Sequence, residues 1–387
     1  MITRSPRLKI VIAGYIVGGP LGGLVWHHLQ YVLGLLKMGH EVLFAEQGHH
    51  YPSCYNPLTN TVSADPSYGL QFISDVFSGF GINDRWAYFD AHKNEWKGRS
   101  RKYVEEFSGS ADIFLNLSGV HPPVSPFFAI PVRIFIDTDP AFTQIAHLTD
   151  PAKNSAAKMH THFFSYGENF GKPGCTIPDD GYNWKPTRQP VVLAEWPYST
   201  GNENTSWTTV MQWDSYKTQE FSGRKYGMKS ASFDPYLLLA SKVNDKMELA
   251  IGCENVIKEK LINAGWLISN PLIIAATHRE YQHYIRHSKG EWSVAKQGYV
   301  ISKSGWFSER SAAYLASGRP VLVQDTGFPA IIETGKGLLS FSTPEEAVEK
   351  IKQVNMDYDF HCKMAAVTAA EYFESGEVLK TLINSVT

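Results

Sequence analysis

The sequence predicts an α/β protein of two domains, each with a parallel sheet covered by helices, that face each other across a cleft. Three observations support this fold class. The chain has 387 residues, which is more than one hydrophobic core usually organises. Short apolar runs alternate with helical patterns, as they do along parallel sheets. A stretch of small and polar residues at 198–206 interrupts this alternation and is typical of an interdomain linker.

The N-terminal half begins with a strand, a loop and a helix. The apolar run LKIVIAGYIV precedes the glycine loop GGPLGG. Apolar residues then recur at helical spacing, at Val25, Leu29, Val32, Leu33 and Leu36. Gly39 stands where the left-handed C-terminal cap of this helix is expected. Later apolar runs predict strands at 111–119, 131–137, 161–167 and 190–196. These elements form a first domain over residues 1–200.

The alternation restarts after the linker. Strands are predicted at 206–213, 246–253 and 319–324, and helices at 232–243 and 255–266. This second domain covers residues 201–368. In parallel sheets of this kind, ligands bind beyond the carboxyl ends of the strands. Two such domains in tandem therefore predict a ligand site in the cleft between them.

The composition is that of a soluble globular enzyme. A net charge of -2 and a charged fraction of 19% give no overall basic excess, so nucleic acid is not the expected partner, although a local basic patch stays open. The four cysteines lack metal-binding spacing, which favours reduced structural thiols and a cytoplasmic protein. The apolar N-terminal run is short and broken by glycines, so we interpret it as a buried strand rather than a signal peptide or membrane span.

The stretch SGWFSERSAAYLASGRPVLVQDTGF places two glycine loops around one short helix. Ser308 can cap a helix that Glu309 begins and Gly318 ends. The positive N-terminal end of such a helix favours an anion, most simply a diphosphate, and Gly305 lets a ligand approach the backbone. The alternative is a capped surface helix with no ligand.

The segment from Ser317 to Ile351 resembles the donor-binding end of glycosyltransferases with two Rossmann-like domains, the GT-B fold. The matching residues, in the order these enzymes carry them, are Gly318, Pro320, Val321, Gly327, Pro329, Ile331, Gly337, Leu338 and Glu345. The first loop and helix resemble those of the retaining, family-four-like members, with matches at Gly22, Gly23, His27, Gly39 and His40. The resemblance covers both ends of the chain, while the middle half matches by topology alone.

This resemblance implies a hexosyltransferase-type enzyme that moves a sugar from a nucleoside diphosphate sugar, such as a UDP-sugar, to an acceptor hydroxyl. The first domain would bind the acceptor and the second the donor, and a last helix over 369–387 would return to the first domain. Two cations five residues apart would neutralise the diphosphate, so that no metal or other cofactor is needed. The residues expected at the donor are Arg224, Lys229, Ser304, Gly305, Trp306, Phe307, Ser308, Glu309, Arg310, Asp325, Thr326, Gly327 and Phe328.

The sequence also departs from the pattern of these enzymes. The retaining members carry two glutamates eight residues apart, where this chain has Gly305 and Ala313. The acidic residue that often follows the proline of the second glycine loop is Ala330 here. The donor sugar and the choice between retention and inversion therefore stay open.

Several polar residues follow the predicted strands of the first domain. The catalytic candidates are His27, His121, Asp137 and Asp139, and the candidates on the acceptor side are Gly22, Gly23 and Glu168. Either aspartate could act as a general base or orient one, which we favour over a metal ligand because the diphosphate candidates lie far away in sequence. A turn before a helix, with Asp139 as its cap, is the alternative. His160 and His162 lack a third metal ligand nearby and are expected to be structural.

Other functions fit the same pattern. A nucleotide-sugar epimerase would need acidic groups near the sugar instead of an acceptor pocket. A non-catalytic module would keep the anion site alone, and a transferase acting on a modified nucleic-acid base is a narrower variant. The sequence leaves the nucleotide, the acceptor and the oligomeric state undetermined.

Overall fold

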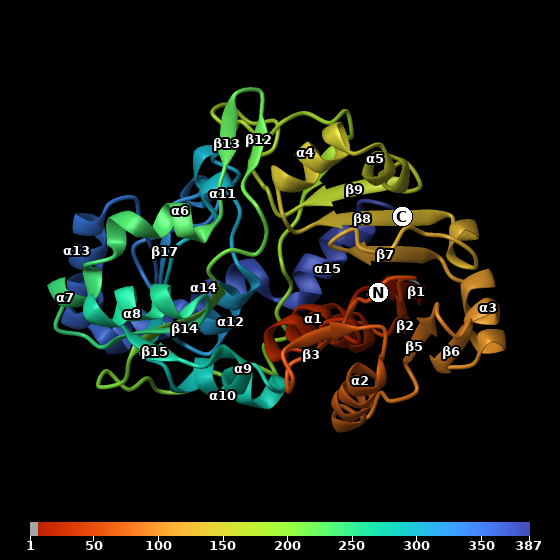
Figure 1. Ribbon diagram of the computed structural model, residues 1–387, viewed down its shortest axis with the longest axis horizontal. Helices are drawn as coiled ribbons and strands as arrows, with labels where there is room; N and C mark the ends of the chain where they lie inside the picture. Colours follow the sequence, from red (N-terminus) through yellow and green to blue (C-terminus); the bar gives the residue numbers. More distant parts are fainter. Residues whose placement is uncertain (1–6) are drawn as a thin grey trace, which may run out of the picture.

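The computed structural model describes residues 7–387 and consists of two α/β domains side by side (Figure 1). The N-terminal domain is built on an eight-stranded sheet in the order β10-β9-β8-β7-β1-β2-β5-β6, parallel except for β6. Its strands are β1 (Lys9–Ala13), β2 (Glu41–Gln47), β5 (Trp86–Asp90), β6 (Glu95–Gly98), β7 (Ile113–Leu117), β8 (Val132–Asp137), β9 (His162–Ser165) and β10 (Trp184–Pro186). Its helices are α1 (Gly22–Lys37), α2 (Ser67–Gly79), α3 (Arg101–Gly109), α4 (Phe142–Thr149) and α5 (Pro151–Ala157). A short hairpin, β3 (Cys54–Asn56) with β4 (Thr61–Ser63), lies outside the sheet.

The C-terminal domain is built on a six-stranded parallel sheet in the order β15-β14-β11-β16-β17-β18. Its strands are β11 (Trp207–Gln212), β14 (Met247–Gly252), β15 (Leu267–Ser269), β16 (Gly290–Ser293), β17 (Val321–Gln324) and β18 (Leu338–Phe341). Its helices are α6 (Lys229–Phe233), α7 (Leu239–Lys242), α8 (Asn255–Asn263), α9 (Pro271–Ile274), α10 (His278–His287), α11 (Gln297–Ile301), α12 (Glu309–Ala316) and α13 (Pro344–Met356). The strand order reverses between β11 and β16, and ligands of doubly wound sheets bind at such a point.

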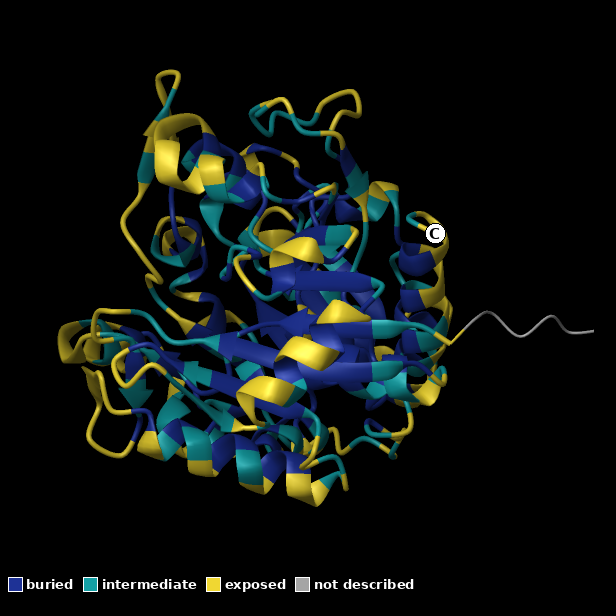
Figure 2. Cartoon of the chain, turned by 90° about the vertical axis from the view of Figure 1, so that its right-hand side faces the viewer, coloured by how far each residue is buried: buried dark blue, intermediate teal, exposed yellow. Residues whose placement is uncertain are grey.

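The strands are buried on both faces because helices cover both sides of each sheet. Figure 2 shows the central strands as buried and the exposed residues on the outer sides of the helices. All residues of β7, with the sequence IFLNL, are buried, which explains why this strand is a continuous apolar run rather than an alternating one.

The domains share an apolar contact between α1 and α10. The indole of Trp26 packs on Trp196 with ring centroids 4.9 Å apart, and its Nε1 donates a hydrogen bond of 2.7 Å to the carbonyl of His278. Gly22 and Gly23 permit this contact, since a Cβ on Gly22 would lie 2.3 Å from the Thr277 carbonyl oxygen. This glycine pair therefore brings the start of α1 against the second domain.

The C-terminal segment consists of two helices, α14 (Tyr358–Phe373) and α15 (Ser375–Asn384), that meet at Glu374. Helix α14 packs against α12, and α15 packs against α1, where Gly34 lies beside Leu379. At the junction, the Val191 amide donates to the Phe373 carbonyl at 2.7 Å and the Val191 carbonyl accepts from the Ser375 amide at 3.0 Å. The chain thus passes between the two halves a second time. The exact domain boundaries stay predictions.

Three predicted elements differ from the structure. The single last helix expected over 369–387 is instead divided between α14 and α15, which meet at Glu374. The run at 190–196 is a loop with a single bridge between Val191 and Glu374, because its apolar side chains fill the space beneath the C-terminal crossing instead of extending the sheet. The predicted helix at 232–243 is broken into α6, a 3-10 turn and α7, since Pro235 lacks the amide that a continuous helix requires.

All four cysteines are free, with Cys54 and Cys362 buried. Between residues 7 and 387, the helices include none that combines the length and apolarity needed to cross a membrane.

Candidate active site

A cavity of about 520 Å³ lies between the domains, where the carboxyl ends of the two sheets face each other. The N-terminal domain contributes the loops after β1, β7 and β8 and the first turns of α1. The C-terminal domain contributes the end of β11, helix α9 and the start of α12. The cavity therefore includes the point between β11 and β16 where the strand order reverses. We call it the interdomain cleft.

The start of α12 forms one wall of the cleft. Ser308 caps this helix, with its side chain accepting from the Arg310 amide at 3.3 Å, and Glu309 is its first residue, so the predicted cap and helix start are confirmed. In the described part of the chain, no hydrogen bond engages the amides of Phe307, Ser308 and Glu309. Gly305 has a φ of +78°, which a side chain would strain. Free amides at a helix start attract an anion.

Lys229 begins α6 and its half-buried side chain lines the cleft. Burial lowers the pKa of its ammonium to about 7, and the charges of Arg310 and Lys296 act in the same direction. The Glu291 carboxylate acts against this lowering of the Lys229 pKa, but it is already paired with Arg310. An anion in the cleft would therefore be the natural partner of Lys229.

Arg310 lines the cleft, and each of its three guanidinium nitrogens donates one hydrogen bond to a protein group. Its Nε donates to Glu291 Oε1 at 2.6 Å, one Nη to the Val210 carbonyl at 2.9 Å and the other to Ser293 Oγ at 3.0 Å. These partners belong to β16 and β11. Glu291 therefore neutralises the Arg310 guanidinium, and the Arg310 side chain is held by both strands at the switch point.

The structure does not bring Arg224 and Lys229 together, as the resemblance implied. Arg224 is exposed on the hairpin β12 (Gln219–Phe221) with β13 (Arg224–Tyr226), which projects from the molecule in Figure 1 and does not line the cleft. The antiparallel hairpin carries the chain away from the sheet before it returns at α6. Lys296 takes the place beside Lys229 instead.

The second glycine loop supports the first one from behind. The Gly327 amide donates to Asp325 Oδ1 at 2.6 Å, and Thr326 Oγ1 donates to the Trp306 carbonyl at 2.5 Å. Phe328 packs on Phe307, with ring centroids 5.2 Å apart. Among the predicted donor residues, those that do not line the cleft are Arg224, Ser304, Gly305, Phe307, Asp325, Thr326, Gly327 and Phe328.

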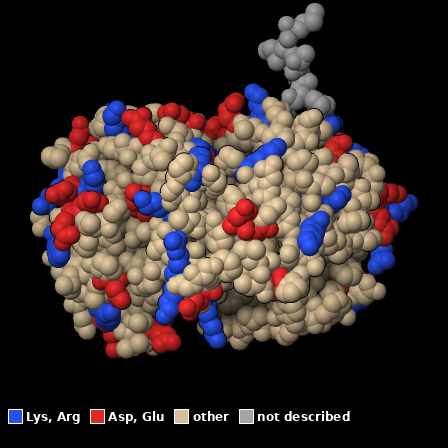
Figure 3. Space-filling view, turned by 90° about the horizontal axis from the view of Figure 1, so that it is seen from above, with Lys and Arg blue, Asp and Glu red and all other residues tan. Residues whose placement is uncertain are grey.

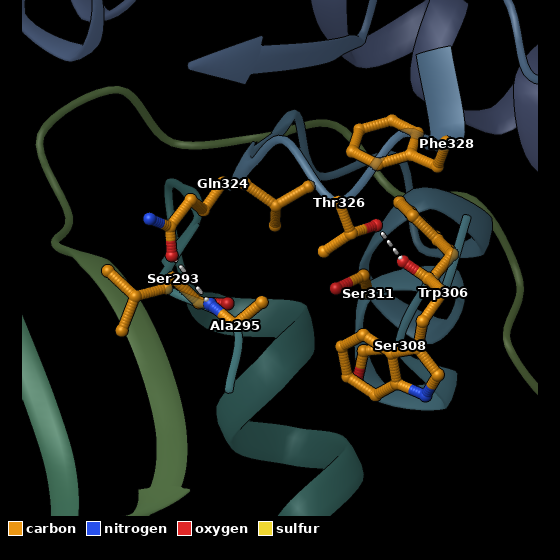
Figure 4. Close-up of a pocket in the computed structure, with 11 residues that line it drawn as sticks. Ser293, Ala295, Trp306, Ser308, Ser311, Gln324, Thr326 and Phe328 are labelled. Atoms are coloured by element: carbon orange, nitrogen blue, oxygen red, sulfur yellow. Dashed lines mark hydrogen bonds between the residues drawn. The ribbon is translucent and has the colours of Figure 1, made fainter. Parts of the chain in front are cut away.

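A small cavity of about 10 Å³ separates these loops from the end of β16 (Figure 4). Figure 4 shows the bond from Thr326 to Trp306 and the contact of Gln324 with the Ala295 amide, which is 3.2 Å long. Ser311 Oγ is buried here without a partner among the described residues. The volume suits at most a single water molecule, so this corner is packing behind the cleft wall.

His27 lies on the second turn of α1 and lines the cleft. Its Nε2 is buried and has no partner within residues 7–387. Burial lowers the pKa of His27 to about 4, so the imidazole is neutral at pH 7. An adjoining small cavity is lined by both His27 and Glu309. A neutral imidazole from one domain and a carboxylate from the other thus face the same space.

The two aspartates after β8 have different surroundings. Asp137 is fully buried and accepts hydrogen bonds from Ser165 Oγ at 2.6 Å, Thr143 Oγ1 at 2.7 Å and Gln144 Nε2 at 3.0 Å. Burial raises the pKa of Asp137. Because these bonds tie β8 to β9 and α4 and the carboxylate does not line the cleft, its position is that of a structural group.

Asp139 lines the cleft and pairs with the second domain. It accepts from Lys296 Nζ at 2.9 and 3.1 Å, from the Tyr216 hydroxyl at 2.5 Å and from the Tyr299 hydroxyl. We call these four residues the Asp139 cluster. Both oxygens of this carboxylate accept hydrogen bonds from the second domain, so Asp139 forms a contact between the domains.

Of the remaining candidates, Gly23 lines the cleft, whereas Gly22, His121 and Glu168 do not. His121 is buried with its Nε2 2.9 Å from the Gly14 carbonyl oxygen. Glu168 pairs with Arg188 at 2.6 Å. His160 contacts the Asn116 side-chain amide at 3.0 Å, while His162 lies on β9. Residues 7–387 hold no group of three or more acidic, histidine or cysteine side chains that could bind a metal ion.

Several cleft residues were not predicted from the sequence, namely Tyr15, Gln212, Tyr216, Tyr281, Lys296 and Tyr299. Lys296 lies three residues after the carboxyl end of β16, but the sequence analysis did not predict this strand and so gave no signal for Lys296. The tyrosines had none, since aromatic residues are frequent along the whole chain.

Comparisons with known proteins support the fold. No family model matches the chain, and no curated protein matches it in sequence. An alpha-glucosyltransferase in complex with UDP-glucose and DNA containing an abasic site superposes with a TM-score of 0.61 at 11% identity, covering 98% of this chain and 99% of the other. HepE of Anabaena, in complex with UDP and glucose, gives 0.56 at 10% identity over 98% and 99%. Sucrose-phosphate synthase from Thermosynechococcus elongatus gives 0.55 at 9% identity over 97% and 98%.

These likenesses extend over nearly the whole of each chain. They confirm the predicted arrangement of two Rossmann-like domains, and the protein has the GT-B fold. At such identities a likeness establishes the fold alone.

Proposed function

We propose that the protein is a glycosyltransferase that moves a sugar from a nucleoside diphosphate sugar to an acceptor hydroxyl. The observation that carries the proposal is the meeting of the Lys229 ammonium and the start of α12 in one cleft at the switch point of a GT-B fold. Since structures of this fold include complexes with UDP and UDP-glucose, a UDP-sugar is the first donor to test.

The diphosphate would lie against the free amides of the α12 start and beside Lys229. Both supply positive charge where the leaving diphosphate gains negative charge, which lowers the barrier to breaking the glycosidic bond. Arg310, which is paired with Glu291, holds the wall behind this position. These groups can neutralise the leaving group without a metal ion, so we propose metal-independent transfer.

His27 is the proposed proton acceptor on the opposite wall. As the acceptor oxygen forms its bond to the anomeric carbon and the bond to the diphosphate breaks, the hydroxyl proton would pass to the unpartnered Nε2 of His27. Asp139 is less suitable because both its oxygens already accept hydrogen bonds from the second domain, and Asp137 because it is buried away from the cleft. Glu309 would hold a hydroxyl of the donor from the other side.

The test is thermal stabilisation by UDP and UDP-glucose together with release of UDP. We expect Lys229→Ala to abolish the stabilisation, because the cleft loses its free cation. Lys225→Ala is the matched control, since this lysine is exposed on the hairpin outside the cleft and should leave the stabilisation unchanged. Stabilisation that survives Lys229→Ala would show that the diphosphate binds elsewhere.

His27→Ala separates binding from turnover. We expect this variant to keep the stabilisation by UDP and to release UDP from UDP-glucose at least tenfold more slowly than the wild type. Unchanged release would remove His27 from the mechanism. Conversion of UDP-glucose into another UDP-sugar, without release of UDP, would identify an epimerase instead.

A further inference from the structure

A second cavity, of about 540 Å³, adjoins the interdomain cleft. It lies between the loop after β7, helices α4 and α5, and the segment that leads into β12. Ser118, Asp139 and Tyr216 line both this cavity and the cleft. We call it the side chamber. Its volume falls within the range of about 300–1,000 Å³ that is usual for small-molecule sites.

The lining of the side chamber combines apolar and aromatic side chains with polar ones such as Thr143 and His147. Phe135 and Phe142 line it, and both rings are otherwise buried in the protein. Val120, Pro122 and Ala146 add aliphatic surface. The apolar part of this lining gains free energy by covering a flat apolar or aromatic group.

The outer rim of the side chamber carries unpaired positive charge. Lys153 on α5 and Lys217 before β12 line it from the two domains, and both are exposed. Along residues 7–387, neither lysine forms an ion pair, and the single acidic residue lining the chamber is Asp139, which Lys296 already neutralises. Figure 3 views the molecule from above and shows Lys and Arg side chains beside a hollow, with Asp and Glu side chains among them. Two free cations over one cavity favour an anionic ligand.

We propose that the side chamber binds the acceptor, and that the acceptor is a hydroxyl-bearing aromatic or similarly flat apolar molecule with a carboxylate or another anionic group. Its ring would lie on Phe135 and Phe142, and its anionic group would lie between Lys153 and Lys217. Its hydroxyl would enter the cleft past Ser118, which lies on the shared boundary. This inference rests on the proposed function, because it assigns the second substrate of the same reaction.

The arrangement also explains why the chamber needs both domains. Lys153 belongs to the first domain and Lys217 to the second, while the Asp139 cluster joins the domains at the boundary between chamber and cleft. The acceptor would therefore bind best when the domains are held together by this cluster.

The experiment uses two probes of the same shape, 3-hydroxy-2-naphthoate and its methyl ester, titrated calorimetrically into the full chain in the presence of UDP. We expect the anionic acid to bind at least tenfold more tightly than the neutral ester. Lys153→Gln and Lys217→Gln should each weaken binding of the acid roughly threefold and together roughly tenfold. Lys158→Gln is the matched control, because Lys158 is exposed beside α5 but does not line the chamber.

Stabilisation by UDP is measured in the same variants and should be unchanged in all of them. If UDP does not stabilise the wild type, the proposed function is contradicted. If UDP stabilises the wild type but the acid and the ester bind equally well, only this inference is contradicted. Acid binding that is insensitive to both lysines would also overturn it. Displacement of the acid by a short DNA duplex, with tight binding of the duplex, would assign the rim to nucleic acid instead.

Discussion

Two charged contacts beside the cleft differ in how firmly they hold. The Arg310–Glu291 pair lies within the C-terminal domain, with side chains 8% and 0% exposed. The Asp139–Lys296 pair joins the two domains, with side chains 31% and 14% exposed. The Arg310–Glu291 pair fixes the wall of the cleft at the start of α12, because both partners are buried and neither can turn to solvent. The Asp139–Lys296 pair is partly exposed, so water can replace its contacts and the domains can separate there at a smaller cost.

The largest expected effect is on the buried pair. Glu291→Ala leaves the Arg310 guanidinium buried without its carboxylate, so we expect the free energy of unfolding to fall by about 3–5 kcal/mol. Urea denaturation measures this change. Glu309→Ala is the comparison, since Glu309 is the exposed first residue of α12, and it should cost well under half as much. Equal losses would show that burial does not distinguish the two carboxylates.

The second expected effect concerns the pH dependence of donor binding. Because burial holds the pKa of Lys229 at about 7, below its ordinary value of 10.5, the free protein loses this proton as the pH rises above 7. Binding of a diphosphate to the protonated form must then take up a proton, so the Kd for UDP should rise by up to tenfold for each pH unit between 7 and 9. Lys229→Arg should flatten this dependence.

The lowered pKa of Lys229 also makes the free energy of unfolding depend on pH. Between pH 7 and 10.5 the unfolded chain holds the Lys229 proton more strongly than the folded one, so Lys229 makes the folded state more stable as the pH rises through this window. Lys229→Met should remove that contribution. Denaturation at pH 6.5 and 9 in both proteins measures it, and identical pH slopes would contradict the lowered pKa.

A smaller effect is expected at the interdomain pair. Asp139→Asn and Lys296→Met should each change the free energy of unfolding by about 1 kcal/mol or less, and a double-mutant cycle gives their coupling. High salt should reduce this coupling but not that of Arg310 with Glu291. A coupling above about 3 kcal/mol would mean that the Asp139–Lys296 contact between the domains is as strong as the buried Arg310–Glu291 pair.

The smallest effect is expected at Arg224. Its exposed position on the β12–β13 hairpin predicts that Arg224→Ala leaves the Kd for UDP within about twofold of the wild type. The sequence alone suggested the opposite, because Arg224 stands five residues before Lys229. Loss of UDP binding in this variant would mean that the hairpin folds over the donor.

The sequence by itself determined several central strands, the helix around Ser308 and the two-domain architecture, but it missed β16 and β18. The mostly apolar run of β7 and the Ser308 side chain that caps α12 are local features, so the sequence alone predicts both elements. The tertiary structure decided which polar residues share the cleft. Lys296 approaches Asp139, and Arg224 is carried away from Lys229, through the packing of segments that are distant in sequence or bent by a hairpin. Residue spacing along the chain cannot encode such contacts, because they depend on how the two sheets are placed against each other.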